Sequence, residues 1–112
     1  MRMTELLKII EDNGKGVRAY SECGRAAREC IKTQSNQATA YYLLSIAADR
    51  FVETYDDQPL LSQGAEDAYL NFKSYVEQLA ETEQENDSAK KLQTLNRVAA
   101  EIADDRFLKT AG

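Results

Sequence analysis

The chain contains no histidine and no tryptophan, a single proline and two cysteines in 112 residues. Without histidine, the Glu-x-x-His ligands of di-iron helical bundles and all imidazole-based zinc sites are excluded. Two cysteines alone are too few to close a tetrahedral structural zinc site. No run approaches 18 apolar residues, so the sequence predicts no membrane-spanning helix. We expect neither a metal nor another cofactor.

The motifs that would mark other chemistry are also missing. The stretch "DNGKG", residues 12–16, begins like a calcium-binding loop, but Gly14 and Gly16 occupy positions where oxygen ligands are needed. A phosphate-binding loop would need Ser or Thr after Lys15, where Gly16 is found. No nucleophile and base stand in a recognisable order, so catalysis is not expected. An enzyme that uses carboxylates or tyrosines remains an alternative.

Apolar residues recur at helical spacing along nearly the whole chain, and no stretch shows the sustained alternation of a strand. The pattern predicts five helices, at residues 4–12, 17–33, 37–56, 63–83 and 88–109. Short connections make neighbouring helices antiparallel. We therefore expect an all-α fold, a compact antiparallel helical bundle of four long helices plus a short N-terminal helix. One domain covers residues 1–112 in this prediction.

The helix at residues 37–56 is the most apolar and is expected at the centre of the bundle. A second chain could cover this helix or the helix at 88–109, so monomer and homodimer both remain open. No secretory signal is visible, because Glu5 and Lys8 interrupt the first apolar residues. The expected compartment is the cytoplasm.

Both cysteines, Cys23 and Cys30, lie in the predicted helix 17–33, seven positions apart. Seven residues advance about 10.5 Å along a helix, whereas the Cα atoms of a disulfide lie within about 7 Å of each other. The two thiols therefore cannot pair while this helix is intact. On a helical wheel they fall on an apolar face rich in small residues, which lets a neighbouring helix approach closely. The sequence predicts buried, structural thiols.

The opposite face of the same helix is basic and carries Arg18, Arg25, Arg28 and Lys32. Glu22 and Glu29 follow Arg18 and Arg25 by four residues and can pair with them, whereas Arg28 and Lys32 have no such acid and are expected to be free. We hypothesise that this basic face contacts an acidic partner, which could be a protein, a second copy of the chain or phosphate. Nucleic acid is not expected, because no aromatic residue is interleaved with these charges.

The net charge of −5 is distributed unevenly along the chain. Residues 1–34 carry seven basic and five acidic residues, a balance of +2, whereas residues 35–112 carry seven basic and fourteen acidic residues, a balance of −7. An acidic body does not attract nucleic acid or anionic membranes. The acids expected to form a partner-binding surface are Asp49, Glu53, Asp56, Asp57, Asp104 and Asp105.

These features favour a protein that acts by binding another protein, as an adaptor, regulator or inhibitor. Size and acidity are typical of the antitoxins, immunity proteins and anti-defence factors of bacteria and phages, an analogy that rests on no motif. A small-ligand carrier is the alternative, and it would need an apolar cavity lined by tyrosines between the helices at 37–56 and 63–83.

Overall fold

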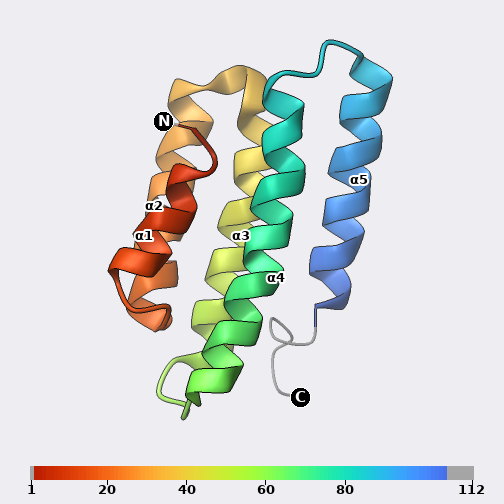
Figure 1. The fold of residues 1–112 in the computed structure, drawn as a ribbon. Helices are drawn as coiled ribbons and strands as arrows, with labels where there is room; N and C mark the ends of the chain where they lie inside the picture. The colour runs from red at the N-terminus through yellow and green to blue at the C-terminus, as the bar shows by residue number, and fades with distance from the viewer. Residues whose placement is uncertain (1, 106–112) are drawn as a thin grey trace.

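The computed structural model describes residues 2–105, and over that range it contains helices and no strand. The five α-helices are α1 (Glu5–Asp12), α2 (Val17–Thr33), α3 (Ala38–Tyr55), α4 (Ser62–Ala80) and α5 (Ser88–Asp104). Two short 3-10 helices, η1 (Ser35–Gln37) and η2 (Glu81–Glu83), precede α3 and follow α4. Successive helices run up and down the molecule, joined by short connections (Figure 1). The predicted all-α bundle is confirmed.

The predicted bounds differ most from the structure at the C-terminal end. The α5 helix ends at Asp104, and Asp105 has the backbone angles of extended chain. The rest of the predicted helix, residues 106–109, lies outside the described residues. The helix predicted at residues 63–83 also ends earlier as an α-helix. The α4 helix ends at Ala80, and the 3-10 helix η2 follows it directly.

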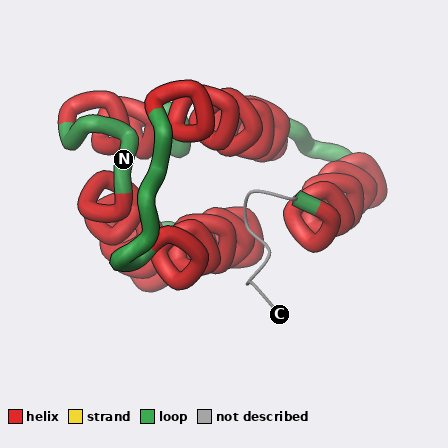
Figure 2. The backbone as a smooth tube through the Cα atoms, turned by 90° about the horizontal axis from the view of Figure 1, so that it is seen from below, coloured by secondary structure: helices red, strands yellow, loops and turns green. Residues whose placement is uncertain are grey.

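The helices differ in how fully they pack. The α2 and α3 helices are the most extensively packed pair, α1 lies against α2 and α4, and α5 lies against α4 and α3. Figure 1 shows α5 at the edge of the bundle, on the far side from α1 and α2, and Figure 2 shows the helices surrounding a common interior. The position of α5 explains why it buries only Val98 and Ile102 and leaves Leu92 exposed.

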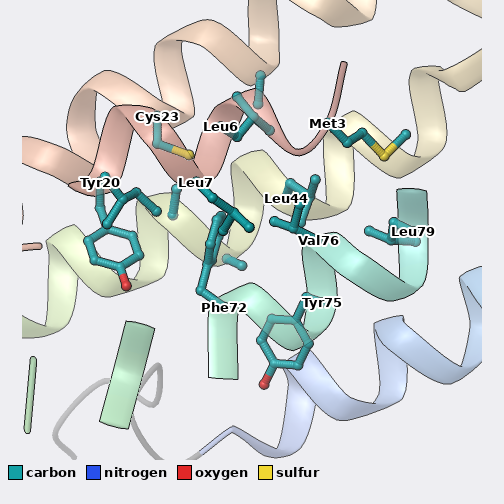
Figure 3. Close-up of a cluster of buried hydrophobic side chains, with 14 of the residues drawn as sticks. Met3, Leu6, Leu7, Tyr20, Cys23, Leu44, Phe72, Tyr75, Val76 and Leu79 are labelled. Carbon is teal, nitrogen blue, oxygen red and sulfur yellow. The ribbon is translucent and has the colours of Figure 1, made fainter. Parts of the chain in front are cut away.

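Aromatic rings from three helices meet in the core. Tyr20 of α2 stacks on Phe51 of α3 with ring centroids 3.8 Å apart, and it meets Phe72 of α4 edge-on at 5.4 Å. Met3 and Leu6 at the N-terminal end join the same buried cluster (Figure 3). Burial of several large rings accounts for a substantial part of the driving force for folding.

Small residues allow α2 and α3 to approach closely. The buried small residues of α2 are Ala19, Cys23, Gly24, Ala27 and Cys30. A Cβ atom placed on Gly24 would lie 2.9 Å from Oδ1 of Asp49 and 3.5 Å from the Cβ of Ala48, both on α3. Both cysteines are free and buried, so the prediction that their side chains lie inside the bundle is confirmed.

Candidate protein-binding surfaces

The predicted basic face of α2 is exposed along its whole length. Its residues are Arg18, Arg25, Arg28 and Lys32. The exposure follows from the helical period, because the opposite side of α2 carries the small buried residues that pack against α3. The structure therefore places all four cations on the outside of the bundle, as their spacing predicts.

Arg28 is not free, contrary to the prediction. Its Nη1 donates hydrogen bonds to both carboxylate oxygens of Asp49 on α3, at 2.8 and 2.9 Å. The prediction compared Arg28 only with acids of its own helix, whereas its partner lies 21 positions further along the chain. This ion pair joins a member of the predicted basic face to a member of the predicted acidic surface. Because the two charges compensate each other, Arg28 and Asp49 each attract an oppositely charged partner less strongly.

The expected pairing along α2 is also different. Glu22 pairs with Arg25, three residues later, with an N–O distance of 3.4 Å. Among the described residues, Arg18 and the carboxylate of Glu29 make no ion pair. A hollow of about 690 Å³ opens between α1 and this side of α2. It is lined by Ile9, Asn13, Arg18, Glu22, Arg25, Ala26 and Glu29.

Three of the predicted acids gather at the end of α3 and in its connection to α4. Glu53, Asp56 and Asp57 are all exposed there. Residues 51–72 contain five acids and no Lys or Arg. A cation reaches this stretch from the α1–α2 turn, where Nζ of Lys15 lies 2.9 Å from Oε2 of Glu66. The three exposed acids are therefore left with a net negative local charge.

The connection between α3 and α4 has a defined conformation. Asp57 adopts a left-handed φ of 58°, which Asp tolerates better than most residues, and the N–H of Gln58 donates to the carbonyl of Tyr55. Leu60 packs against the core, whereas Leu61 is 78% exposed. Sequence reasoning missed Leu61, because two adjacent leucines in a connection have no helical register that separates an inward from an outward one. We call Glu53, Asp56, Asp57 and Leu61 the α3–α4 acidic end.

Asp105 does not belong to an exposed surface, contrary to the prediction. It is 7% exposed, and its carboxylate accepts a hydrogen bond from the Tyr75 hydroxyl of α4. Figure 3 shows the Tyr75 side chain extending toward α5. Because α5 ends at Asp104, the helical wheel no longer predicts the direction of the next residue. Asp104 remains exposed, but it lines a separate hollow between α4 and α5 with Asn71 and Ser74.

The groups whose pKa is displaced are buried thiols and phenols. Burial raises the pKa of the Cys23 thiol to about 12 and also raises that of Cys30. Burial raises the pKa of Tyr20 and of Tyr75, and the hydrogen bond to Asp105 raises the latter further. Each group is therefore protonated at neutral pH, where a nucleophile or general base would need to lose its proton. No group of three or more Cys, Asp or Glu in residues 2–105 is placed to hold a metal ion.

No protein-family model, curated protein or solved structure matches this chain. Of the helices within residues 2–105, none is long and apolar enough to cross a bilayer.

Proposed function

We propose that this protein acts by binding another protein, as an adaptor, regulator or inhibitor, and that the α3–α4 acidic end receives a basic surface of that partner. The observation that carries the proposal is that the exposed Leu61 follows three exposed carboxylates closely in the chain. All four residues lie within residues 51–72, which contain no Lys or Arg. In a complex, the apolar side chain can be buried against the partner, and the carboxylates can pair with basic residues of the partner.

Each part of the acidic end has a physical role in such a complex. The carboxylates of Glu53, Asp56 and Asp57 attract a basic surface over roughly 8–10 Å at moderate ionic strength, which speeds association and sets orientation. Burying the side chain of Leu61 is worth about 1.5–3 kcal/mol. Leu60 anchors the connection to the core, so little ordering is needed when a partner binds.

The other predicted acids contribute less to this surface. Asp49 already compensates Arg28, and Asp105 is buried against Tyr75. Asp104 lies on α5 and lines the α4–α5 hollow. The proposal therefore rests on the C-terminal turn of α3 and the connection that follows it, rather than on all six acids.

The test begins with the wild-type protein as bait in an extract of its native host, with captured proteins identified by mass spectrometry. A captured candidate is then purified, and its Kd is measured by calorimetry against two variants. One variant carries Glu53→Gln, Asp56→Asn and Asp57→Asn, and the other carries Leu61→Ser. We expect the first to raise Kd by at least about tenfold at low salt, and high salt to weaken the wild-type complex similarly.

A matched control removes three exposed acids elsewhere through Asp12→Asn, Glu77→Gln and Glu81→Gln. This control has the same net charge as the triple variant of the acidic end, so a general charge effect would appear equally in both. We expect its Kd to stay within about twofold of the wild type. Binding that is insensitive to salt and to both variants of the acidic end would contradict the proposal.

A further inference from the structure

We propose that α2 is a self-association surface, on which the α2 helix of a second copy of this chain packs antiparallel about a two-fold axis. Four residues on the outer side of α2 carry the proposal, and we call them the α2 charge stripe: Arg18, Glu22, Arg25 and Glu29. This inference goes beyond the proposed binding at the α3–α4 acidic end, because it uses a different helix and a different occupant.

The four residues form one narrow stripe. They are spaced by four, three and four positions, which confines them to an arc of about 60° on the helix at 100° per residue. This spacing is also that of the a and d positions through which two helices pack along their length. All four side chains line the same hollow beside α1, so they share one face of the molecule.

The order of charges along the stripe is positive, negative, positive, negative. If two copies of α2 run antiparallel about an axis between positions 23 and 24, Arg18 faces the partner's Glu29 and Glu22 faces the partner's Arg25. Every residue of the stripe then meets an opposite charge, and the symmetry repeats both contacts. A parallel arrangement would set identical charges against each other. The stripe is therefore complementary to itself in the way that a two-fold interface requires.

The side chains of the stripe are available for such contacts. Within residues 2–105, Arg18 and the Glu29 carboxylate make no ion pair, and the Glu22–Arg25 pair is solvent-exposed with an N–O distance of 3.4 Å. An exposed pair of this kind contributes little and can exchange partners across an interface. Ser21 and the half-buried Ala26 flank the stripe on its two sides, and both are small enough to let the helices approach.

The overall charge of the chain does not oppose this arrangement. Although the whole chain has a net charge of −5, the two arginines and two glutamates of the α2 charge stripe sum to zero, so two copies that meet through it do not press net charges of one sign together. The α2 helix has 17 residues and is about 25 Å long. Two such helices packed side by side bury a surface area at the small end of the range known for protein–protein interfaces. We expect a weak dimer that dissociates as salt is added, because its contacts are solvent-exposed charge pairs.

Sedimentation velocity on the wild-type protein is the first measurement, from about 5 to 500 µM in low salt and in high salt. We expect a concentration-dependent monomer–dimer equilibrium whose Kd rises at least about tenfold between about 50 and 500 mM salt. A monomer at every concentration in low salt would overturn the proposal.

Charge exchange within the stripe then tests the arrangement. Arg18→Glu alone or Glu29→Arg alone places like charges in both symmetry-related outer contacts, so each should raise the dimer Kd by at least about tenfold. The double variant Arg18→Glu/Glu29→Arg restores opposite charges and should dimerise like the wild type. An equimolar mixture of the two single variants should form a heterodimer, because one chain is acidic at both positions and the other is basic at both.

The control is Lys90→Glu at the start of α5, which changes the net charge by the same amount as Arg18→Glu and should leave dimerisation unchanged. Far-UV circular dichroism checks that each variant retains its helical content. A wild-type dimer that persists equally in both single variants would show that another face holds the copies together. That result overturns the proposal, as would a folded double variant that stays monomeric together with a mixture that forms no heterodimer.

Discussion

Replacing Gly24 by alanine tests how α2 and α3 are held together. The new Cβ would lie 2.9 Å from Oδ1 of Asp49, 3.3 Å from Nη1 of Arg28 and 3.5 Å from the Cβ of Ala48. The first two atoms are the ends of flexible side chains that form the interhelical ion pair, whereas the third is an ordinary van der Waals contact. The substitution should therefore displace the ion pair and leave the helix backbones in place.

The expected change in stability follows from two opposing effects. Gly→Ala inside a helix stabilises by about 0.8–1 kcal/mol, because glycine loses more backbone entropy on folding. Displacing the half-exposed Arg28–Asp49 pair costs about 0.2–1 kcal/mol. Gly24→Ala alone should thus change the free energy of unfolding by between about −0.2 and +0.8 kcal/mol. In an Asp49→Ala background the ion pair is already lost. There Gly24→Ala should raise the free energy of unfolding by the full helix-propensity gain of about 1 kcal/mol.

Urea unfolding of the four proteins of this double-mutant cycle, followed by circular dichroism, measures the difference. Gly64→Ala in α4 is a suitable control, because its Cβ would make only an ordinary contact, 3.5 Å from Leu60, and its effect should not depend on Asp49. Equal gains from Gly24→Ala in both backgrounds would refute the placement of Asp49 over Gly24. A loss of more than about 1 kcal/mol in both would show that the α3 backbone, rather than a side chain, closes against this position.

Two further predictions concern single groups. Cys23 should lower the free energy of unfolding as the pH rises above 9, by up to about 1.4 kcal/mol per pH unit from this group, because the thiol loses its proton near its ordinary pKa of 9.0 when unfolded but keeps it to about 12 when folded. Urea unfolding at several pH values should show a shallower fall in Cys23→Ala, and an equal slope would refute this role for the thiol. Asp87→Ala should cost about 1 kcal/mol in the same assay, because its carboxylate accepts hydrogen bonds from the N–H groups of Ala89 and Lys90 at the start of α5. Asp87→Asn should retain most of this stability, and a neutral Asp87→Ala would contradict the cap.

The helices and their buried faces could be predicted because both follow from local periodicity. In α2, the wheel places Cys23 and Cys30 inside and the arginines outside, as observed. Contacts between helices could not be predicted in this way. The pairing of Arg28 with Asp49 depends on how α2 and α3 lie against each other, and no spacing within one helix reveals it.

The directions of side chains beyond the end of a helix could not be predicted either. Asp105 follows the last residue of α5, so its direction is set by the turn of the chain and by Tyr75, which lies thirty positions earlier. In the α3–α4 connection, Leu60 and Leu61 differ in exposure although they are chemically identical neighbours. Helical spacing carries no information where there is no helix, so these features had to come from the structure.

The close α2–α3 pairing also favours early contact between these two helices during folding. Only η1 and its flanking residues separate the two helices, so closing this hairpin costs little chain entropy and its contacts can form early. The α5 helix, by contrast, docks against helices made earlier in the chain and buries two large side chains. Because α5 buries so few side chains, its amide hydrogens should exchange with solvent before those of α2 and α3.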